Sequence, residues 1–276
     1  MLKSIVIGIG IALGLAASCI WISNARFDRI AERRISDLLD QGQGNGDVVT
    51  EGDLADLPVP VQNWLRNSGI LGHRIPRTIR LQQEGEIRLG PDKPWMPFHA
   101  DQFYTLNPPA FLWRVSASMA PGIFIRGVDS LRNGHGEMQM LPLALFKVVD
   151  ATGPEIDQGT ALRYLQEIVW FPAAALSSFI QWTAIDDLSA EATLTLETLS
   201  VTGTFCFNAR GDIVNFKALR YRNEMMEPWS TPLHSHDVVD GIRIPVSGEG
   251  VWGESDEAFT YIRLRLIDLA SDAGEG

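Results

Sequence analysis

The stretch Ile79-Arg-Leu-Gln-Gln-Glu-Gly-Glu-Ile-Arg-Leu89 alternates apolar or small residues with charged or polar ones, except that Gln83 falls at an apolar position. Successive side chains of a β-strand point to opposite faces of its sheet, so a period of two indicates a strand with one apolar and one wet face. Such a strand is typical of an antiparallel sheet whose outer face is solvated. This pattern decides the fold class, and we read the rest of the chain outward from it.

Further segments of the same kind follow along the chain. Turn residues such as Asn107-Pro-Pro109 and Asp240-Gly241 separate them. The spacing predicts strands over residues 98–106, 111–119, 123–131, 137–141, 179–185, 190–196, 201–207, 213–221, 233–239, 242–252 and 259–269. Because strands do not alternate with helices at βαβ spacing, a parallel sheet is not expected.

One helix interrupts the strands. Residues 154–172 begin and end with proline, and an apolar stripe runs along one side of the segment, made of Leu162, Leu165, Ile168 and Val169. Arg163, Gln166 and Glu167 lie opposite this stripe, and we expect Glu167 to be a solvated partner of Arg163. The predicted class is therefore α+β: a large curved antiparallel sheet, an open or half barrel, with this helix on its concave face.

The N-terminal residues predict a membrane element. No charged residue occurs from Ser4 to Ala25, and about 20 apolar residues are enough for a helix to cross a bilayer. We divide the chain into a membrane anchor or signal segment (1–25), a juxtamembrane helix with an acidic, glycine-containing linker (26–56), and a β half-barrel domain (57–276). Small residues before Cys19 leave cleavage or lipidation there as an alternative to a retained anchor.

The orientation of the anchor is contested by the sequence. Arg26, Arg29, Arg33 and Arg34 follow the span and only Lys3 precedes it, a count that would keep the body in the cytoplasm. Signal sequences, however, commonly begin with a single positive residue. We expect a membrane-anchored protein of the cell envelope whose body is extracytoplasmic.

Composition and charge exclude several classes of protein. The 276 residues carry 23 Lys and Arg against 34 Asp and Glu, a formal charge of −11, which argues against nonspecific nucleic-acid binding because that requires a basic surface. Two cysteines, Cys19 and Cys206, do not make a disulfide scaffold. The sequence gives no indication of oligomeric state.

Familiar catalytic arrangements are not evident. His234 and His236 lie two residues apart on a predicted strand, near Asp237, and would suit zinc only with a further ligand that the sequence does not supply nearby. Asp186 and Asp187 read as a turn. We therefore expect surface histidines, no metal, no cofactor and no catalytic residues, with a hydrolase that uses carboxylates and His234 and His236 as an alternative.

A set of short motifs resembles an uncharacterised bacterial family, a domain of unknown function, over roughly residues 57–268. The order of the motifs carries the resemblance: Leu57-Pro-Val-Pro-Val-Gln62, Trp95-Met-Pro-Phe98, Pro108-Pro-Ala-Phe-Leu-Trp113, Met119-Ala-Pro-Gly122, Gly153-Pro-Glu-Ile-Asp157, Trp170-Phe-Pro172, Ile185-Asp-Asp187, Pro228-Trp229 and Ile244-Pro245. The resemblance implies no established activity. The architecture also looks like the envelope lipoprotein-sorting half-barrels, in which a curved sheet holds acyl chains under a helical lid.

This shape predicts a binding function. Curved sheets covered by helices can enclose an apolar cavity, so we expect a nonenzymatic protein that binds a lipid-like or other apolar ligand between the sheet and the helix. The contacting residues would be Leu165, Trp170, Phe171, Phe179 and Trp182. A structural or partner-binding component of a membrane complex is the third possibility.

Overall fold

The computed structural model describes residues 2–44, 46–197, 199–222 and 224–272. The helices are α1 (Leu2–Leu39), α2 (Val59–Ser68) and α3 (Pro154–Glu167), with short 3-10 turns η1 (Glu51–Leu54), η2 (Ile168–Trp170), η3 (Pro172–Leu176) and η4 (Ser255–Glu257). The strands are β1 (Thr78–Ile87), β2 (Met96–Leu106), β3 (Pro109–Ala120), β4 (Ile123–Arg132), β5 (His135–Pro142), β6 (Val149–Ala151), β7 (Ile180–Asp186), β8 (Ser189–Leu196), β9 (Leu199–Phe207), β10 (Ile213–Arg222), β11 (Met225–Ser230), β12 (His236–Val239), β13 (Ile242–Pro245), β14 (Ser247–Trp252) and β15 (Phe259–Ser271).

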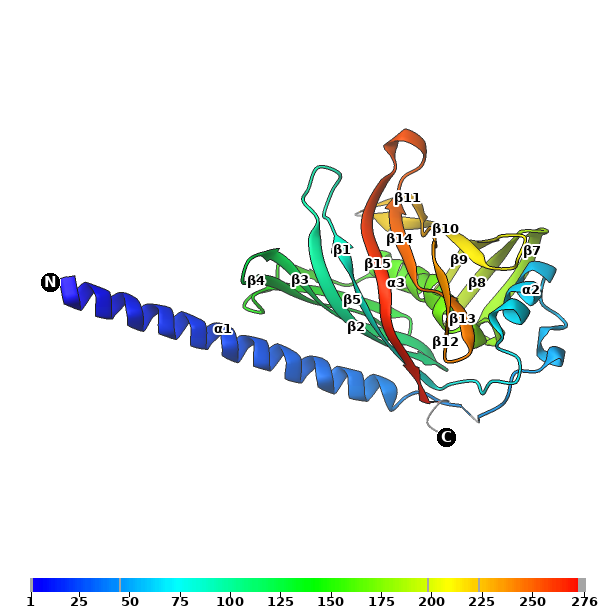
Figure 1. Ribbon diagram of the computed structural model, residues 1–276, viewed down its shortest axis with the longest axis horizontal. Coiled ribbons are helices and arrows are strands. Elements are labelled where there is room, and N and C mark those ends of the chain that lie inside the picture. Colours follow the sequence, from blue (N-terminus) through cyan, green and yellow to red (C-terminus); the bar gives the residue numbers. More distant parts are fainter. Residues whose placement is uncertain (1, 45, 198, 223, 273–276) are drawn as a thin grey trace.

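Thirteen strands form one sheet that curls around α3 (Figure 1). Their order is β6-β5-β4-β3-β2-β1-β15-β14-β11-β10-β9-β8-β7, so the first and last strands of the folded body meet at the centre, where β1 pairs with β15. The pairings described for this sheet are antiparallel. The predicted class, an α+β half barrel with a central helix, is confirmed.

A separate hairpin, β12–β13, does not join this sheet. The sequence predicts one strand over residues 242–252, but the structure divides it into β13 and β14. The first part pairs with β12 while the second pairs with β15. One continuous alternating segment therefore serves two sheets.

The apolar stripe of α3 packs onto the concave face as predicted. Leu162, Leu165, Ile168 and Val169 are each fully buried. Aromatic rings extend this core between the end of the helix and the sheet, where the ring centroids of Tyr104 on β2 and Phe171 are 4.6 Å apart. The core therefore lies between α3 and the inside of the sheet.

The opposite side of α3 is not solvated, so the expectation for Glu167 was wrong. Glu167 is 4% exposed, and its Oε1 is 2.8 Å from Nε of Arg163. Arg163 also reaches Oδ2 of Asp129 on β4 at 2.6 Å, while Gln102 and Tyr104 donate to Oε2 of Glu167. The curled sheet surrounds the helix on both sides, and burial raises the pKa of Glu167.

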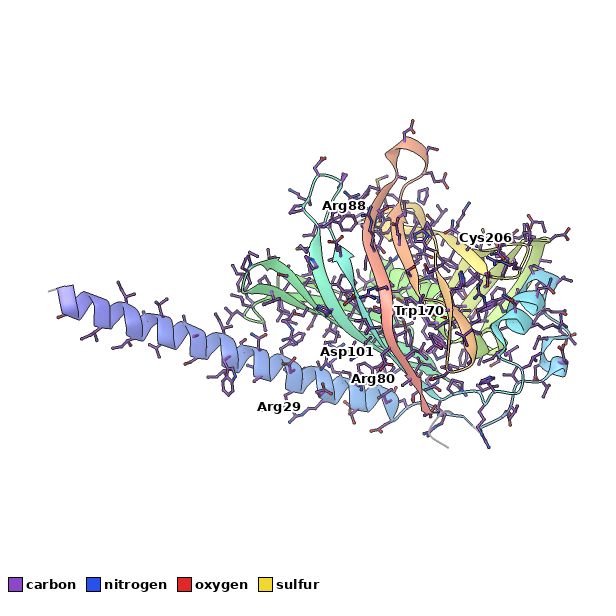
Figure 2. The ribbon with its side chains drawn as sticks, in the orientation of Figure 1. Arg29, Arg80, Arg88, Asp101, Trp170 and Cys206 are labelled. Atoms are coloured by element: carbon purple, nitrogen blue, oxygen red, sulfur yellow. The ribbon has the colours of Figure 1, made fainter. Side chains whose placement is uncertain are left out.

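Helix α1 combines an exposed half with a packed half. Residues 7–22 lie free of the body, and the helix is long and apolar enough to cross a membrane by length and composition. Its C-terminal half packs on the convex face of the sheet, where Ile35 and Leu38 join a cluster with Phe103, Leu112 and Val128. Arg29 lies on the side of α1 that faces away from the sheet (Figure 2).

The segment between α1 and α2 also contributes to the body. Val49 and Leu54 are buried in the main core. A backbone pairing connects Val48 to Arg74. Helix α1 continues to Leu39, so residues 26–39 belong to the same helix as the apolar span. Helix α1 and the half barrel are therefore joined by packed contacts.

The buried charge cluster of α3 gives a first prediction. Replacing Arg163 with Ala leaves Asp129 and Glu167 buried without their cation, so we expect the free energy of unfolding to fall by about 3–5 kcal/mol. Arg66→Ala removes an exposed ion pair with Glu51 and should cost at most about 1 kcal/mol. Urea denaturation of both variants measures the difference, and equal effects would contradict the assigned role.

Candidate functional site

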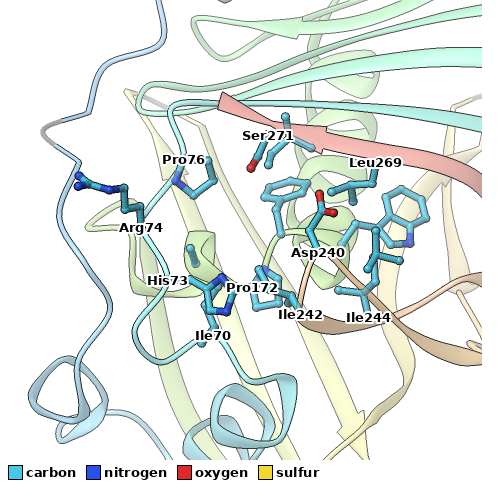
Figure 3. A pocket seen from close by; sticks show the side chains of 15 residues that line it. Ile70, His73, Arg74, Pro76, Pro172, Asp240, Ile242, Ile244, Leu269 and Ser271 are labelled. Atoms are coloured by element: carbon cyan, nitrogen blue, oxygen red, sulfur yellow. The ribbon is translucent and has the colours of Figure 1, made fainter. Parts of the chain in front are cut away.

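An enclosed apolar pocket lies where α3 ends (Figure 3). Its volume is about 100 Å³, and its walls come from four parts of the chain. These are the loop before β1 together with the start of that strand, the segment from η2 to η3, the β12–β13 hairpin and the end of β15. The apolar side chains that line it include Ile70, Ile79, Trp170, Phe171, Ile242, Ile244 and Leu269.

Local sequence sets the two aromatic walls. Pro172 cannot continue the helix in line, so the chain leaves α3 through two 3-10 turns, with Trp170 at the end of η2 and Phe171 between the two turns. Nε1 of Trp170 donates to the carbonyl oxygen of Pro245 at 3.0 Å, which satisfies the indole N–H in the interior. The end of α3 is thereby connected to the hairpin that covers the pocket.

The mouth of the pocket is polar. His73, Arg74, Asp240 and Ser271 lie around it, and Arg74 extends away from the interior (Figure 3). Nη1 of Arg74 donates to the carbonyl oxygen of Gly46 at 3.1 Å. An apolar interior with a few polar groups at the rim is the usual composition of a site for an amphipathic small molecule.

A buried carboxylate holds the β12–β13 hairpin in place. Oδ1 of Asp212 accepts from Nε of Arg243 on β13 at 2.8 Å and from Nδ2 of Asn67 on α2 at 2.9 Å. On β12, Nε2 of His236 is 3.0 Å from the carbonyl oxygen of Ile213. The hydrogen bond with Arg243 is the main reason that the pKa of Asp212 falls to about 2.

The predicted ligand-binding residues separate into two groups. Trp170 and Phe171 line the pocket. Leu165 is fully buried in the α3 core, and Trp182 packs its ring 5.1 Å from that of Phe205 and donates to the carbonyl oxygen of Ala175. Phe179 is half-buried just before β7.

Sequence reasoning missed the remaining pocket residues. Ile70 and Leu269 are almost two hundred positions apart, and the pairing of β1 with β15 brings their segments together. The alternation of Ile242 and Ile244 was recognised only as part of a strand. No local pattern marks these positions as neighbours.

The candidate catalytic residues do not converge. Nε2 of His234 is 3.8 Å from Glu249, whereas His236 bonds to the backbone of Ile213. Oδ1 of Asp186 accepts from the backbone N–H of Leu188 at 2.9 Å, as expected of a turn residue. Among the residues described, no group of three or more His, Cys, Asp or Glu side chains is placed to hold a metal ion.

The ion pair between Asp212 and Arg243 gives a second prediction. Its folded-state pKa of about 2 lies below the ordinary 3.8, so the ion pair stabilises the fold above pH 3.8 and this stabilisation is lost as the pH falls towards 2. Asp212→Asn should cost about 2 kcal/mol at neutral pH. Thermal unfolding from acidic to neutral pH should show the gap between wild type and variant closing in acid. Glu51→Gln, at an exposed ion pair, serves as control. A stability difference between wild type and Asp212→Asn that does not depend on pH would contradict the assigned role of Asp212.

Comparisons place the chain among known sequences and folds. No curated protein matches it significantly. A DUF1329 family protein from Desulfovibrio piger is similar with a TM-score of 0.45 and 10% identity, over 79% of this chain and 95% of that one. A domain named as an outer membrane lipoprotein-sorting protein from Vibrio parahaemolyticus is similar with a TM-score of 0.42 and 9% identity, over 71% and 86%.

The sequence itself matches a family over most of the folded body. Residues 47–264 match a family of unknown function, DUF6544. This range contains nearly all of the 57–268 region in which we found the motif resemblance, and it confirms the expectation of an uncharacterised family. The chain therefore belongs to the DUF6544 family.

Proposed function

We propose that this protein is anchored in a membrane of the cell envelope and binds the apolar end of a lipid-like ligand in the pocket beside Trp170. The observation that carries the proposal is the enclosed apolar pocket with its polar mouth. An apolar interior favours a hydrocarbon group, and the rim of His73, Arg74 and Asp240 favours a ligand with a polar end. No chemical step is required of such a site.

The size of the pocket limits the ligand. Its volume of about 100 Å³ fits the end of an acyl chain or another short hydrocarbon group, not a whole lipid. Each methylene that leaves water there contributes about 0.8 kcal/mol. The rest of the ligand would extend through the polar mouth.

The β12–β13 hairpin forms one wall of the pocket. The hairpin pairs only with itself, and side-chain contacts from Arg243, His236 and Trp170 connect it to the body. Ile244 of the hairpin is also buried in the main core, so the hairpin is a packed wall of the pocket. The ligand would enter through the polar mouth, where Arg74 and Asp240 are exposed.

The exposed half of α1 supports the anchor. Seven of its large apolar side chains are more than half exposed, and Trp21 is the most exposed at 73%; the seven are Ile7, Ile9, Ile11, Leu13, Leu15, Trp21 and Ile22. A row of such side chains is costly in water and favourable in hydrocarbon. Trp21 is close to the end of the apolar run, where tryptophan is common at membrane interfaces. The extracytoplasmic placement of the body is part of the proposal.

A filled pocket should lose its ligand. Ala173 is 3% exposed and lines the pocket, so Ala173→Leu places a larger side chain in the space. Displacing two methylenes of ligand should weaken binding about 15-fold. Ala184→Leu adds the same atoms at an exposed position on β7 and is the control.

Native mass spectrometry of lipid that copurifies with the full-length protein in detergent measures this effect. We expect an adduct on wild type and on Ala184→Leu, with loss of the adduct from Ala173→Leu. An adduct retained equally by all three proteins would place the lipid elsewhere, and wild type without any adduct would favour a structural or partner-binding role. Urea denaturation of each variant identifies a loss caused by unfolding.

The anchor is tested separately. We expect the full-length protein to stay in the membrane pellet after washes with high salt and alkaline carbonate, and to enter solution with detergent. The physical reason is the apolar surface of α1, which such washes do not remove from hydrocarbon. Full-length protein in the wash would contradict anchoring.

A further inference from the structure

We infer that the tip of the β3–β4 hairpin and the β5–β6 loop form a second membrane contact, which inserts into the lipid headgroup layer beside α1. The inference rests on the proposed anchoring and goes beyond it, because it assigns a lipid-facing surface to the half barrel itself. This surface, called here the tip patch, consists of Met119, Ile123, Phe124, Leu145, Phe146 and Val148.

Helix α1 is clamped along β4 at several levels. Nη1 of Arg126 donates to Oδ1 of Asn24 at 3.1 Å, and the same guanidinium pairs with Asp28. Further along, Nη2 of Arg34 donates to Oγ of Ser130 at 2.9 Å. Residue numbers rise together in the two elements, so strand and helix run in the same direction.

The contacts at these levels are spaced by similar distances along α1 and along β4. The ten residues from Asn24 to Arg34 cover about 15 Å of helix. The four residues from Arg126 to Ser130 cover about 13 Å of strand. The β3–β4 hairpin tip at Gly122, which precedes Arg126 in the chain, therefore lies beside the C-terminal part of the apolar span. We place this part of the span at the membrane surface.

Direct contacts fix the second loop at the same depth. Oγ of Ser23 donates to the carbonyl oxygen of Ala144 at 2.5 Å, and Nδ2 of Asn24 donates to that of Leu143 at 3.1 Å. The N–H of Leu143 in turn donates to the carbonyl oxygen of Phe124 at 2.7 Å. Helix, hairpin and loop thus form one unit where α1 leaves its apolar span.

The backbone of this loop is held in an unusual conformation. Leu143 and Ala144 have φ values of 51° and 59°, a left-handed conformation that is uncommon for residues other than glycine. Both carbonyl groups accept hydrogen bonds from α1. The anchor helix therefore takes part in shaping the loop that carries Leu145 and Phe146.

The tip patch has the composition of a lipid-contacting surface. Its six side chains are 41% to 60% exposed, with Phe146 the most exposed. Apolar side chains gathered at one end of a soluble body mark an interaction surface. A lipid bilayer is the occupant that fits, because the patch lies beside the point where the apolar half of α1 begins, and a bilayer around α1 would reach it.

The test uses spin labels on the full-length protein in phosphatidylcholine vesicles. Labels are attached through Phe146→Cys or Ile123→Cys in a background of Cys19→Ser and Cys206→Ser. Ile185→Cys is the matched control, since Ile185 is 53% exposed on β7 at the other edge of the sheet. Ile11→Cys reports on the span itself.

We expect the labels at positions 146 and 123 to collide with oxygen, which concentrates in lipid, and to be protected from a water-soluble nickel chelate. The label at position 185 should show the reverse. Thermal unfolding of each labelled protein confirms that it is folded.

Two results would overturn the inference, and they are distinguishable. If position 11 reports lipid while positions 146 and 123 behave like position 185, the anchor stands and the tip patch is wrong. If position 11 also reports water, the anchoring itself fails, and the tip patch fails with it.

Discussion

The Arg163 guanidinium, buried between Asp129 of β4 and Glu167 of its own helix, fixes α3 inside the curled sheet. Apolar packing alone is not directional, whereas a buried cation requires its carboxylates at particular distances. The rings of Phe111 and Trp113 lie beside the same guanidinium, at 5.1 and 4.8 Å from their centroids. The apolar stripe holds α3 on the sheet, and the ion pairs of Arg163 add the directional contacts that orient the helix and the pocket at its end.

Strand β4 transmits this constraint to the outside of the body. Because side chains alternate across a strand, Asp129 points inward to Arg163 while Val128 and Ser130 point outward to α1. The same strand thus holds the core helix on one face and the proposed anchor helix on the other. A shift of either helix would therefore displace Val128, Asp129 and Ser130, and through them the other helix.

The sequence predicted those features that depend on local periodicity. Alternation along residues 79–89 indicated the antiparallel sheet, and the stripe of α3 indicated its packed side. The burial of Glu167 was not predictable in the same way, because helical periodicity treats charged residues as solvated unless a distant partner is known. The distant partners of Glu167 are Gln102 and Tyr104 on β2, and only the curl of the sheet brings that strand to α3. Of the pocket, only Trp170 and Phe171 were predicted, and the other walls were missed because they meet through the β1–β15 pairing.

The relative placement of pocket and anchor bears on how the proposed function would work. Ile79 and Ser271 of the pocket are paired at the start of β1, and the neighbouring Thr78 lies against Gly42, just beyond the C-terminal end of α1. The apolar span ends near Ile22, so about 17 helical residues, or about 25 Å, would separate the pocket from the surface of the proposed membrane. A ligand bound there would have left the bilayer. The geometry therefore fits a ligand that is bound on the aqueous side better than one that is bound within the proposed membrane.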